Sequence, residues 1–356
     1  MTSIETKDAV VHFNNKVYLA LNDFLKDCLT SKIFVIVDEN THVDCLPDFL
    51  SKIETDIAIE VIEIPEGELH KTIETCIGVW NALSELDADR KSLIINLGGG
   101  VVTDLGGFVA CTYKRGIEYI NVPTSLLAMV DASVGGKTGV DLGSLKNQIG
   151  VISEPKMVLI DTEFLNTLPQ NHMKSGLAEM LKHGLIRDEA YWDKLSSLEQ
   201  LSIEDLDQLI YDSVVIKNNV VTEDPTEQGL RKILNFGHTL GHAIESYFLD
   251  AKDKAALLHG EAIAIGMILE THLSTKYCGF SKDDLNTISA TFLKTFKKVT
   301  IENKDFDPIV DLMKYDKKNS HGKVKFVLLN NIGNPEVDCE VSNSDIFEAF
   351  KYYNAL

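Results

Sequence analysis

The chain contains 356 residues, of which 44% are hydrophobic and 25% are charged, and it is therefore long enough for two folded domains. Its formal net charge of −20 argues against nucleic-acid and anionic-membrane partners, because both require a basic face. No apolar run approaches the length of a membrane span, residues 1–10 lack the regions of a signal peptide, and the six cysteines form no C-x-x-C pair. We expect a cytoplasmic protein with no nucleic-acid and no membrane partner.

The first part of the chain alternates short β-branched runs with helical periodicity. It predicts a helix at 72–86 and strands at 33–37, 57–64, 92–96, 117–122 and 157–160. Strands that alternate with helices favour a mostly parallel sheet with helices on both faces. The fold class expected for this part is therefore α/β.

Helical periodicity dominates the second part of the chain. It predicts a loop at 249–257, a late strand at 324–328 before a turn-rich stretch at 330–335, and helices at 173–186, 203–220, 230–248, 260–276 and 283–293. The change of pattern places a domain boundary between residues 161 and 170. We expect an α/β nucleotide-binding domain at residues 1–165 and an α-helical domain at residues 166–356.

A glycine cluster follows the predicted strand 92–96. Gly98, Gly99 and Gly100 let the backbone turn sharply and approach a ligand, and the helix that begins there offers free N–H groups to a phosphate. The cluster is not the G-x-G-x-x-G fingerprint of dinucleotide-binding folds, so that motif gives no support. The alternative is a tight strand–helix connection with no ligand.

A second glycine-rich segment runs from Asp131 to Asn147. Two glycines precede Lys137, and Lys146 and Asn147 follow within ten residues. We interpret the segment as a loop that presents ammonium groups to phosphate or carboxylate oxygens. The alternative is a surface loop whose lysines are solvated.

The helical part contains the residue types of a metal site. On the predicted helix 230–248, the i, i+3, i+7 spacing puts Asn235, His238 and His242 on one face. Two glycines on this helix, at positions 237 and 241, cost about 1 kcal/mol each relative to alanine, so we expect another element to approach it closely.

Further candidate ligands lie on the neighbouring predicted helices. His259 precedes one helix, and Glu179 shares a face of another with Lys182. Two histidines and one glutamate form a catalytic type of zinc site with an open position. The residues alone do not decide which histidine binds metal and which acts as a base, and hydrogen-bonded core histidines are the alternative.

Further cations occur near these motifs, at Arg115, Lys217, Arg231, Lys317 and Lys318. Taken singly, each is best interpreted as a solvated surface charge. Together they predict a cluster that captures an anionic substrate against the negative charge of the whole chain.

These motifs resemble the 3-dehydroquinate synthase family. The resemblance covers residues from about 95 to 330, in the family's order, and lies in GGGVVTD (98–104), YKRG (113–116), VPTSLLAMVDASVGGKTGVD (122–141), KNQIG (146–150), FLNTLP (164–169), SGLAEMLKHG (175–184), GLRKILNFGHTLGHAIE (229–245), HGEAIAIG (259–266) and DKK (316–318). It implies a Rossmann-like N-terminal domain and an α-helical C-terminal domain, in a homodimer.

The resemblance also implies roles for individual residues. Zinc or cobalt would be held by Glu179, His238 and His259, and His242 would be a proton-transfer group beside the substrate. The substrate pocket would contain Arg115, Asp131, Lys137, Lys146, Asn147, Lys182, Lys217, Arg231, Asn235 and one lysine of the pair Lys317 and Lys318. The NAD site would use Asp38, Asn40, Glu68, Lys71, Gly99, Gly100, Asp104, Thr124, Ser125 and Thr167, with Asp131, Lys137 and Lys146 beside them.

The family's reaction belongs to the shikimate pathway. Bound NAD oxidises the C5 hydroxyl of 3-deoxy-arabino-heptulosonate 7-phosphate, while the metal polarises that oxygen. Phosphate leaves by β-elimination, the hydride returns, the ring opens, and an intramolecular aldol step gives 3-dehydroquinate. The resemblance thus implies a carbon–oxygen lyase in which NAD is not consumed.

The chain departs from the family pattern at several places. Thr103 stands where glycine is frequent, Asp141 where asparagine is frequent, and Pro225 interrupts a segment usually written Asp-Glu. The stretch between His242 and His259 is also a few residues longer than the commonest form.

Three other functions share parts of this inventory. Related cyclases of the 2-epi-5-epi-valiolone synthase type act on sedoheptulose 7-phosphate, and others act on glucose 6-phosphate. Metal-dependent polyol dehydrogenases have the same overall fold but would not need so many lysines. A non-catalytic NAD-binding protein would not need the polar positions.

Overall fold

The computed structural model describes residues 1–143, 145–197, 203–313 and 324–356. The chain forms two compact units. Unit 1 comprises Met1–Met173 and Glu204–Asn218, and unit 2 comprises Lys174–Ile203 and Asn219–Leu356. Within the part of the chain that the structure describes, no helix is both long and apolar enough to cross a membrane.

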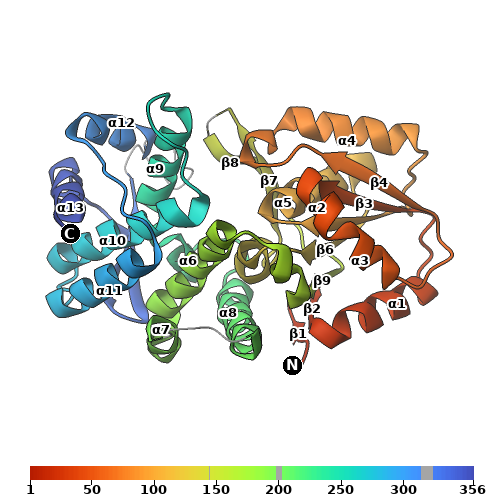
Figure 1. Cartoon of the computed structure of the whole chain (residues 1–356), viewed down its shortest axis with the longest axis horizontal. Coiled ribbons are helices and arrows are strands. Elements are labelled where there is room, and N and C mark those ends of the chain that lie inside the picture. The colour runs from red at the N-terminus through yellow and green to blue at the C-terminus, as the bar shows by residue number, and fades with distance from the viewer. Residues whose placement is uncertain (144, 198–202, 314–323) are drawn as a thin grey trace. The chain divides into compact units, whose positions relative to one another are not determined.

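Unit 1 contains a seven-stranded sheet in the order β1-β2-β9-β6-β5-β3-β4 (Figure 1). The strands are β1 (Ile4–Glu5), β2 (Val10–Phe13), β3 (Ile33–Asp38), β4 (Ile59–Ile64), β5 (Leu93–Gly98), β6 (Glu118–Pro123) and β9 (Met157–Ile160). β1 and β2 pair antiparallel, and the other neighbours pair parallel. The predicted α/β class is confirmed, and β3, β4, β5, β6 and β9 lie where strands were predicted, whereas β1 and β2 were not predicted.

Helices cover this sheet because its strands are apolar on both faces. Phe34 and Ile36 of β3 share a buried cluster with side chains of α4 and α5, while the alternate residues Val35 and Val37 are buried on the opposite side. The helices of unit 1 are α1 (Val17–Asp27), α2 (Glu39–Asp44), α3 (Leu46–Ser51), α4 (Ile73–Glu85) and α5 (Gly100–Thr112).

The interpretation of residues 131–147 as a loop is wrong. A π-helical turn, η4 (Ala128–Ala132), leads into an antiparallel hairpin of β7 (Lys137–Leu142) and β8 (Leu145–Ile152). The two strands approach each other so closely that only glycine fits at position 139. A Cβ there would lie 2.4 Å from the carbonyl oxygen of Ile149. The hairpin gives Lys137, Lys146 and Asn147 defined positions on strands.

Unit 2 is helical, as predicted, and also carries a two-stranded hairpin (Figure 1). The turn-rich stretch after the predicted late strand is the turn of this hairpin. The elements are α6 (Gln170–Arg187), α7 (Glu189–Ser196), α9 (His238–Asp250), α10 (His259–Tyr277), α11 (Lys282–Thr295), α12 (Asn303–Met313), α13 (Asn343–Ala355), β10 (Phe326–Asn331) and β11 (Asn334–Cys339). Residues of α8 (Ile203–Glu223) contribute to both units.

The predicted helix 230–248 is broken in two. A 3-10 helix, η6 (Leu230–Asn235), ends before Gly237, whose left-handed backbone (φ 79°) is the N-cap of α9. Glycine adopts this conformation without the steric cost that other residues meet. Arg231 and Asn235 therefore lie on η6, and the predicted common face of Asn235 with His238 and His242 is wrong.

The expected close approach to this region is made by α10. A Cβ at Gly266 would lie 2.0 Å from the carbonyl oxygen of Gly237, and one at Gly241 would lie 3.1 Å from Cα of Ile263. The start of α10 makes a similar contact with α6, since a Cβ at Gly260 would lie 2.3 Å from Cα of Ser175. Because glycine has no side chain, α6, α9 and α10 can pack with their backbones almost in contact.

We predict that Gly266→Ala lowers the free energy of unfolding by about 1–3 kcal/mol, because its methyl group would overlap backbone that cannot move independently. Gly78→Ala is the matched control, since a Cβ there meets nothing within 4 Å on the exposed side of α4. It should stabilise the chain by about 1 kcal/mol through helix propensity. Urea unfolding followed by circular dichroism measures both, and equal midpoints for the two variants would contradict the packing argument.

Candidate active site

Three neighbouring strands of unit 1 end at predicted nucleotide-binding residues. Asp38 ends β3, Gly99 follows β5 and Thr124 follows β6. The chain passes from β3 to β4 on one side and places β5 on the other side of β3, so the strand order reverses at this point. Crevices at the carboxyl ends of strands at such a reversal are the usual ligand sites of parallel sheets.

Glycine shapes the start of α5. Gly99 is its N-cap, and a Cβ there would lie 3.3 Å from Oγ of Ser125. Without a side chain at the cap, the first-turn N–H groups face outward toward any anion placed there. Thr103, where the family often has glycine, is accommodated because its hydroxyl donates to the carbonyl groups of Gly99 and Gly100, both at 3.2 Å.

The remaining predicted nucleotide residues have varied surroundings. The Asp38 carboxylate caps α2 by accepting from the backbone N–H of Thr41 at 2.8 Å, and the Asn40 amide donates to Glu66. Thr167 lies on η5 (Thr162–Thr167).

Sequence reasoning missed Cys45, whose buried thiol contacts the hydroxyl groups of both Thr124 and Thr167. Burial raises the pKa of this thiol to about 12.

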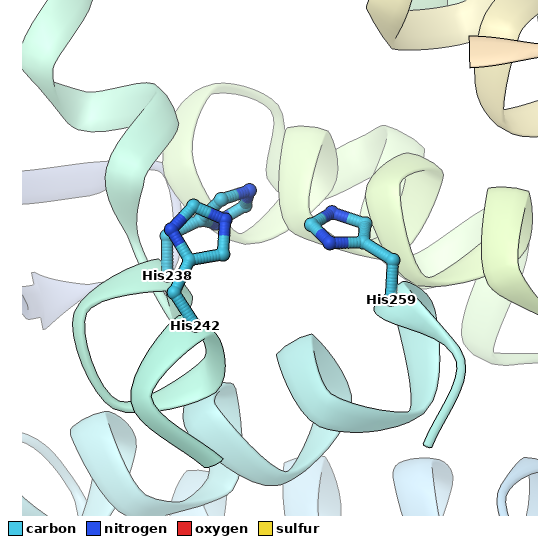
Figure 2. A group of neighbouring side chains, drawn as sticks. All are labelled: His238, His242 and His259. Atoms are coloured by element: carbon cyan, nitrogen blue, oxygen red, sulfur yellow. The ribbon is translucent and has the colours of Figure 1, made fainter. Parts of the chain in front are cut away.

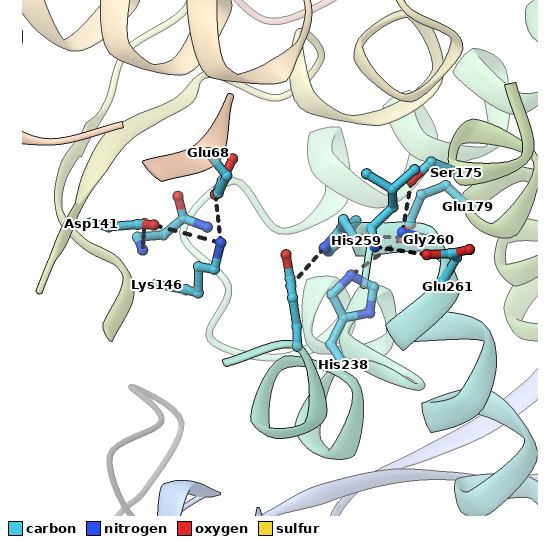
Figure 3. A network of polar contacts seen from close by, with 12 residues as sticks. Glu68, Asp141, Lys146, Ser175, Glu179, His238, His259, Gly260 and Glu261 are labelled. Carbon is cyan, nitrogen blue, oxygen red and sulfur yellow. Dashed lines mark hydrogen bonds and ion pairs between the residues drawn. The ribbon is translucent and has the colours of Figure 1, made fainter. Parts of the chain in front are cut away.

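A network of charged side chains joins α5 to the β7–β8 hairpin, and Figure 3 shows its part around Lys146, Glu68 and Asp141. Lys71 donates to Asp104 at 2.6 Å and to Asn147 at 2.7 Å. Burial alone would lower the pKa of the Lys71 ammonium, but Asp104 and the neighbouring carboxylates outweigh it and raise that pKa. Lys71 therefore stays charged.

The second half of this network surrounds Lys146. Lys146 donates to Glu68 at 2.9 Å and lies 3.7 Å from Asp141, which accepts from the backbone N–H of Asn147 at 2.6 Å. Asp141, where the family often has asparagine, adds a third carboxylate to Glu68 and Asp104, so three formal negative charges face two lysines. This network therefore brings predicted residues together, but its lysines are largely neutralised by their own neighbours.

Asp131 and Lys217 also meet in unit 1. The Lys217 ammonium on α8 bonds the side chain of Asp131 at 2.6 Å and also its backbone carbonyl. Lys137 begins β7 with an exposed side chain. Arg115 is exposed on η3 (Tyr113–Arg115), where its backbone is left-handed at φ 71°.

In unit 2, Glu179, His238 and His259 converge from α6, α9 and α10 (Figure 3). Oε1 of Glu179 lies 3.5 Å from Nε2 of His238 and 3.5 Å from Nε2 of His259. In a tetrahedral zinc site with bonds of about 2.1 Å, two ligand atoms are about 3.4 Å apart. The distances from Glu179 to each of the two histidines thus match the separation of two ligands around one small cation.

The other ring nitrogen of each histidine has an acceptor. Nδ1 of His238 lies 3.0 Å from the carbonyl oxygen of Phe236, and Nδ1 of His259 lies 3.2 Å from Glu245. Because a carbonyl or carboxylate oxygen only accepts, each Nδ1 carries hydrogen, and Nε2 is left to bind metal. Sequence reasoning missed Glu245, although it closes the quoted motif 229–245.

Glu179 is suited to remain ionised. It is completely buried, and among the described residues neither of its oxygens accepts a well-formed hydrogen bond. Burial alone would raise the pKa of this carboxyl group, but Lys182, in ion-pair contact one turn along α6, and the two histidines lower it well below 4.5. A buried, ionised carboxylate that faces two histidine nitrogens fits a divalent cation.

His242 lies beside His238 and His259. Its ring centroid is 5.1 Å from that of His238 and 5.6 Å from that of His259 (Figure 2). The three histidines also form a possible ligand group, with nitrogen atoms within 4.8 Å of one another. The common contact of Glu179 Oε1 with His238 and His259 agrees with the prediction of these two as ligands.

The surroundings of His238 and His259 have opposite effects on the pKa values of the two rings. Burial lowers the pKa of His238 well below 6.5, and the Lys182 ammonium adds to this effect. Burial also disfavours protonated His259, but its contacts with Glu179 and Glu245 outweigh burial and raise its pKa to about 10. These surroundings therefore favour a neutral His238 and a protonated His259.

The predicted substrate residues on η6 are held by the turn that precedes it. Arg231 is buried and donates through Nη1 to the carbonyl group of Pro225 at 2.7 Å, and its backbone N–H donates to Asp224. Asn235 donates to Glu227 at 2.7 Å. The departure at Pro225 thus keeps a carbonyl acceptor for Arg231. Lys317 and Lys318 lie outside the described residues.

Two family models match consecutive parts of the chain. The one described as 3-dehydroquinate synthase N-terminal matches residues 61–175, and the one described as 3-dehydroquinate synthase C-terminal matches residues 176–319. The 3-dehydroquinate synthase of Parabacteroides distasonis is 40% identical over 335 residues, which cover 94% of each chain. That of Thermoanaerobacter pseudethanolicus is 40% identical over 92% of each chain. The chain belongs to the 3-dehydroquinate synthase family.

Solved structures of related enzymes share this architecture. A 2-deoxy-scyllo-inosose synthase complexed with carbaglucose-6-phosphate, NAD+ and Co2+ matches over 99% of both chains with a TM-score of 0.84 and 26% identity. A glycerol dehydrogenase from Schizosaccharomyces pombe matches 100% of this chain and 90% of its own, with a TM-score of 0.67 and 13% identity. The second likeness shows the fold alone.

The stretch before His259, longer than is common in 3-dehydroquinate synthases, is anchored to α12. Lys254 donates to the fully buried Asp305 at 2.6 Å, and Tyr247 donates to the same carboxylate at 2.7 Å. Burial alone would raise the pKa of Asp305, but the bonds from Lys254, Tyr247 and the backbone of Glu302 outweigh it and lower the pKa below 3.8. The two bonds from Lys254 and Tyr247 therefore anchor the longer stretch that precedes His259.

We predict that Asp305→Asn lowers the free energy of unfolding at neutral pH by about 1.5–3 kcal/mol, because bonds to a charged group are lost. A carboxyl group with a depressed pKa stabilises the fold above its unfolded pKa and loses this effect as the pH falls through its folded pKa. The difference between wild type and variant should therefore shrink below pH 3.8. Denaturant titrations across pH measure it.

Asp253→Asn is the control for this prediction, since the exposed Asp253 pairs with Lys304 next to the same loop. Its free energy of unfolding should stay close to that of the wild type, because an exposed ion pair contributes little. A difference for Asp305→Asn that does not vary with pH would mean that the side chain acts through packing and not through its charge.

Proposed function

We propose that the chain converts 3-deoxy-arabino-heptulosonate 7-phosphate into 3-dehydroquinate and phosphate, as a carbon–oxygen lyase that depends on NAD and a divalent metal. The observation that carries the proposal is the common 3.5 Å spacing of Glu179 Oε1 from the histidines of α9 and α10. The 40% identity to a 3-dehydroquinate synthase over 94% of both chains supports the choice of reaction.

The proposed metal ligands are Glu179, His238 and His259, and zinc or cobalt fits this mixed nitrogen and oxygen set. When bound, the metal supplies Lewis acidity at a substrate oxygen. Nδ1 of each histidine is engaged by a carbonyl or carboxylate, which holds both rings in the orientation for binding. His242, beside them, is the proposed proton-transfer group.

The proposed NAD site is the edge of the sheet where β3, β5 and β6 end. Gly99 and Gly100 leave room for the cofactor's phosphates at the start of α5, and Asp38 stands at the end of the adjacent strand. NAD supplies reversible hydride transfer when it is bound. Other proposed contacts are Asn40, Glu68, Lys71, Asp104, Thr124, Ser125, Lys146 and Thr167.

The proposed substrate carries a carboxylate and a phosphate, and its negative charges require cationic side chains for binding. Lys137 and Arg115 have exposed side chains, and Lys182 and Lys217 each contact a carboxylate. We infer that the two exposed side chains contribute most to capture of the anion, because a ligand can reach them, and that the two buried lysines orient groups of the site. Asp131, Asn147, Arg231 and Asn235 complete the proposed set.

Two alternatives are less well supported. The 2-deoxy-scyllo-inosose synthase is 26% identical, against 40% for the 3-dehydroquinate synthase of Parabacteroides distasonis. The glycerol dehydrogenase shares the fold at 13% identity. A homodimer and a cytoplasmic location stay predictions.

We predict that chelation abolishes activity and that zinc or cobalt restores it. His238→Ala should also lack stoichiometric metal after purification, because one of three ligands is lost. Metal content measured by mass spectrometry checks this prediction. His172→Ala is the control, because His172 is exposed and its loss should leave the metal content unchanged. Full occupancy in His238→Ala would contradict the ligand assignment.

We predict that the enzyme turns over many substrates for each NAD, since the cofactor is oxidised and reduced again within one cycle. With limiting NAD, phosphate and 3-dehydroquinate should appear in equal amounts while the absorbance of NADH stays flat. The assay separates the proposed cyclase from a dehydrogenase. Accumulation of NADH in step with substrate loss would identify a polyol dehydrogenase type of reaction instead.

A further inference from the structure

Both proposed histidine ligands are the first residues of helices. His238 begins α9 and His259 begins α10. The N-terminus of a helix carries about half a positive elementary charge, which favours anions. A divalent cation held by these two residues, with the Lys182 ammonium also in contact with Glu179, sits in a local field that opposes it.

A buried carboxylate on α10 stands at the start of α9. Glu270 is completely buried and accepts from the backbone N–H of Gly237 at 2.6 Å and of Leu240 at 3.2 Å. It lies one turn after Gly266, which is the residue in closest contact with Gly237. The two donors flank His238 in the chain.

The N-cap residue of α9 cannot provide this group itself. Gly237 has a left-handed backbone, and a Cβ there would lie 2.3 Å from Cγ and 3.1 Å from N of Met267. Serine, aspartate or asparagine, the usual capping residues, are thereby excluded at this position. The group that caps the N-terminus of α9 therefore comes from the neighbouring helix α10.

We propose that Glu270 is a positioning residue for the metal centre. Its carboxylate fixes the first turn of α9, and its negative charge offsets the helix-end field at His238, which strengthens binding of a divalent cation by Glu179, His238 and His259. The inference rests on the metal dependence proposed above. It adds a residue that touches neither metal nor substrate and acts through the backbone on both sides of His238.

The test compares zinc affinity of apo-protein variants by competition with a zinc-binding dye. Glu270→Gln keeps the size and one acceptor but removes the charge, and its zinc dissociation constant should rise by about 10- to 100-fold, the usual range for a residue that supports a ligand. Asp188→Asn is the matched control, because Asp188 caps α7, a helix with no histidine, by accepting from Tyr191. Its zinc affinity should equal that of wild type.

Two further measurements separate positioning from simple capping. A purely structural cap would lower the melting temperature of the apo-protein but leave the zinc affinity of the folded variant unchanged, and that result would overturn the inference. The visible spectrum of the cobalt-loaded variant reports ligand geometry independently of activity. Unchanged bands together with weaker binding assign the effect to charge, and shifted bands assign it to displacement of His238; both results support the inference.

Glu270→Asp decides the matter if the glutamine variant does not fold. It keeps the charge but moves it away from the N–H of Gly237, so zinc affinity should fall by several-fold with unchanged circular dichroism, and wild-type affinity would overturn the inference. Wild-type protein that binds no stoichiometric zinc or cobalt would overturn the proposed metal dependence as well, which distinguishes the two failures.

Discussion

Gly266 of α10 lies so close to the carbonyl group of Gly237 that a side chain on Gly266 would overlap backbone. Most of the geometry of unit 2 follows from this contact. Because the helices meet at backbone distance, the first residues of α9 and α10 come near enough for His238 and His259 to share one oxygen of Glu179. The contact of Gly260 with Ser175 fixes α6 in the same way, four residues before Glu179.

Charge in this protein is balanced locally, although the chain as a whole carries −20. Lys71 and Lys146 are surrounded by Glu68, Asp104 and Asp141, and Lys254 is held by the buried Asp305. Buried ammonium and carboxylate groups need such partners, since an unpaired charge in the interior costs several kcal/mol. A lysine in a motif is therefore not by itself evidence for an anion site, because the fold can already have given it a carboxylate.

The strands of unit 1 were predictable because both faces of a parallel sheet are buried, which makes β3 and β5 continuous apolar runs. The β7–β8 hairpin was not, since its glycines and lysines are equally typical of a loop. Helical periodicity likewise continued through Gly237, so spacing alone placed Asn235 on one face with His238 and His242. The left-handed backbone at Gly237 ends that periodicity, and it depends on contact with α10, a segment far along the chain.

The sequence by itself determined the α/β class of the first part, the helical character of the second, the residue types of a metal site and the motifs that the 3-dehydroquinate synthase family shares. These are local properties, written in apolar periodicity and in short stretches of the chain. Only the tertiary structure decided which nitrogen of His238 and of His259 faces Glu179, which lysines contact carboxylates, and that Glu245 and Glu270 contact His259 and the backbone beside His238. Such relations join residues that are distant in the chain. They depend on differences of a few tenths of an ångström in contact distance, which residue spacing does not specify.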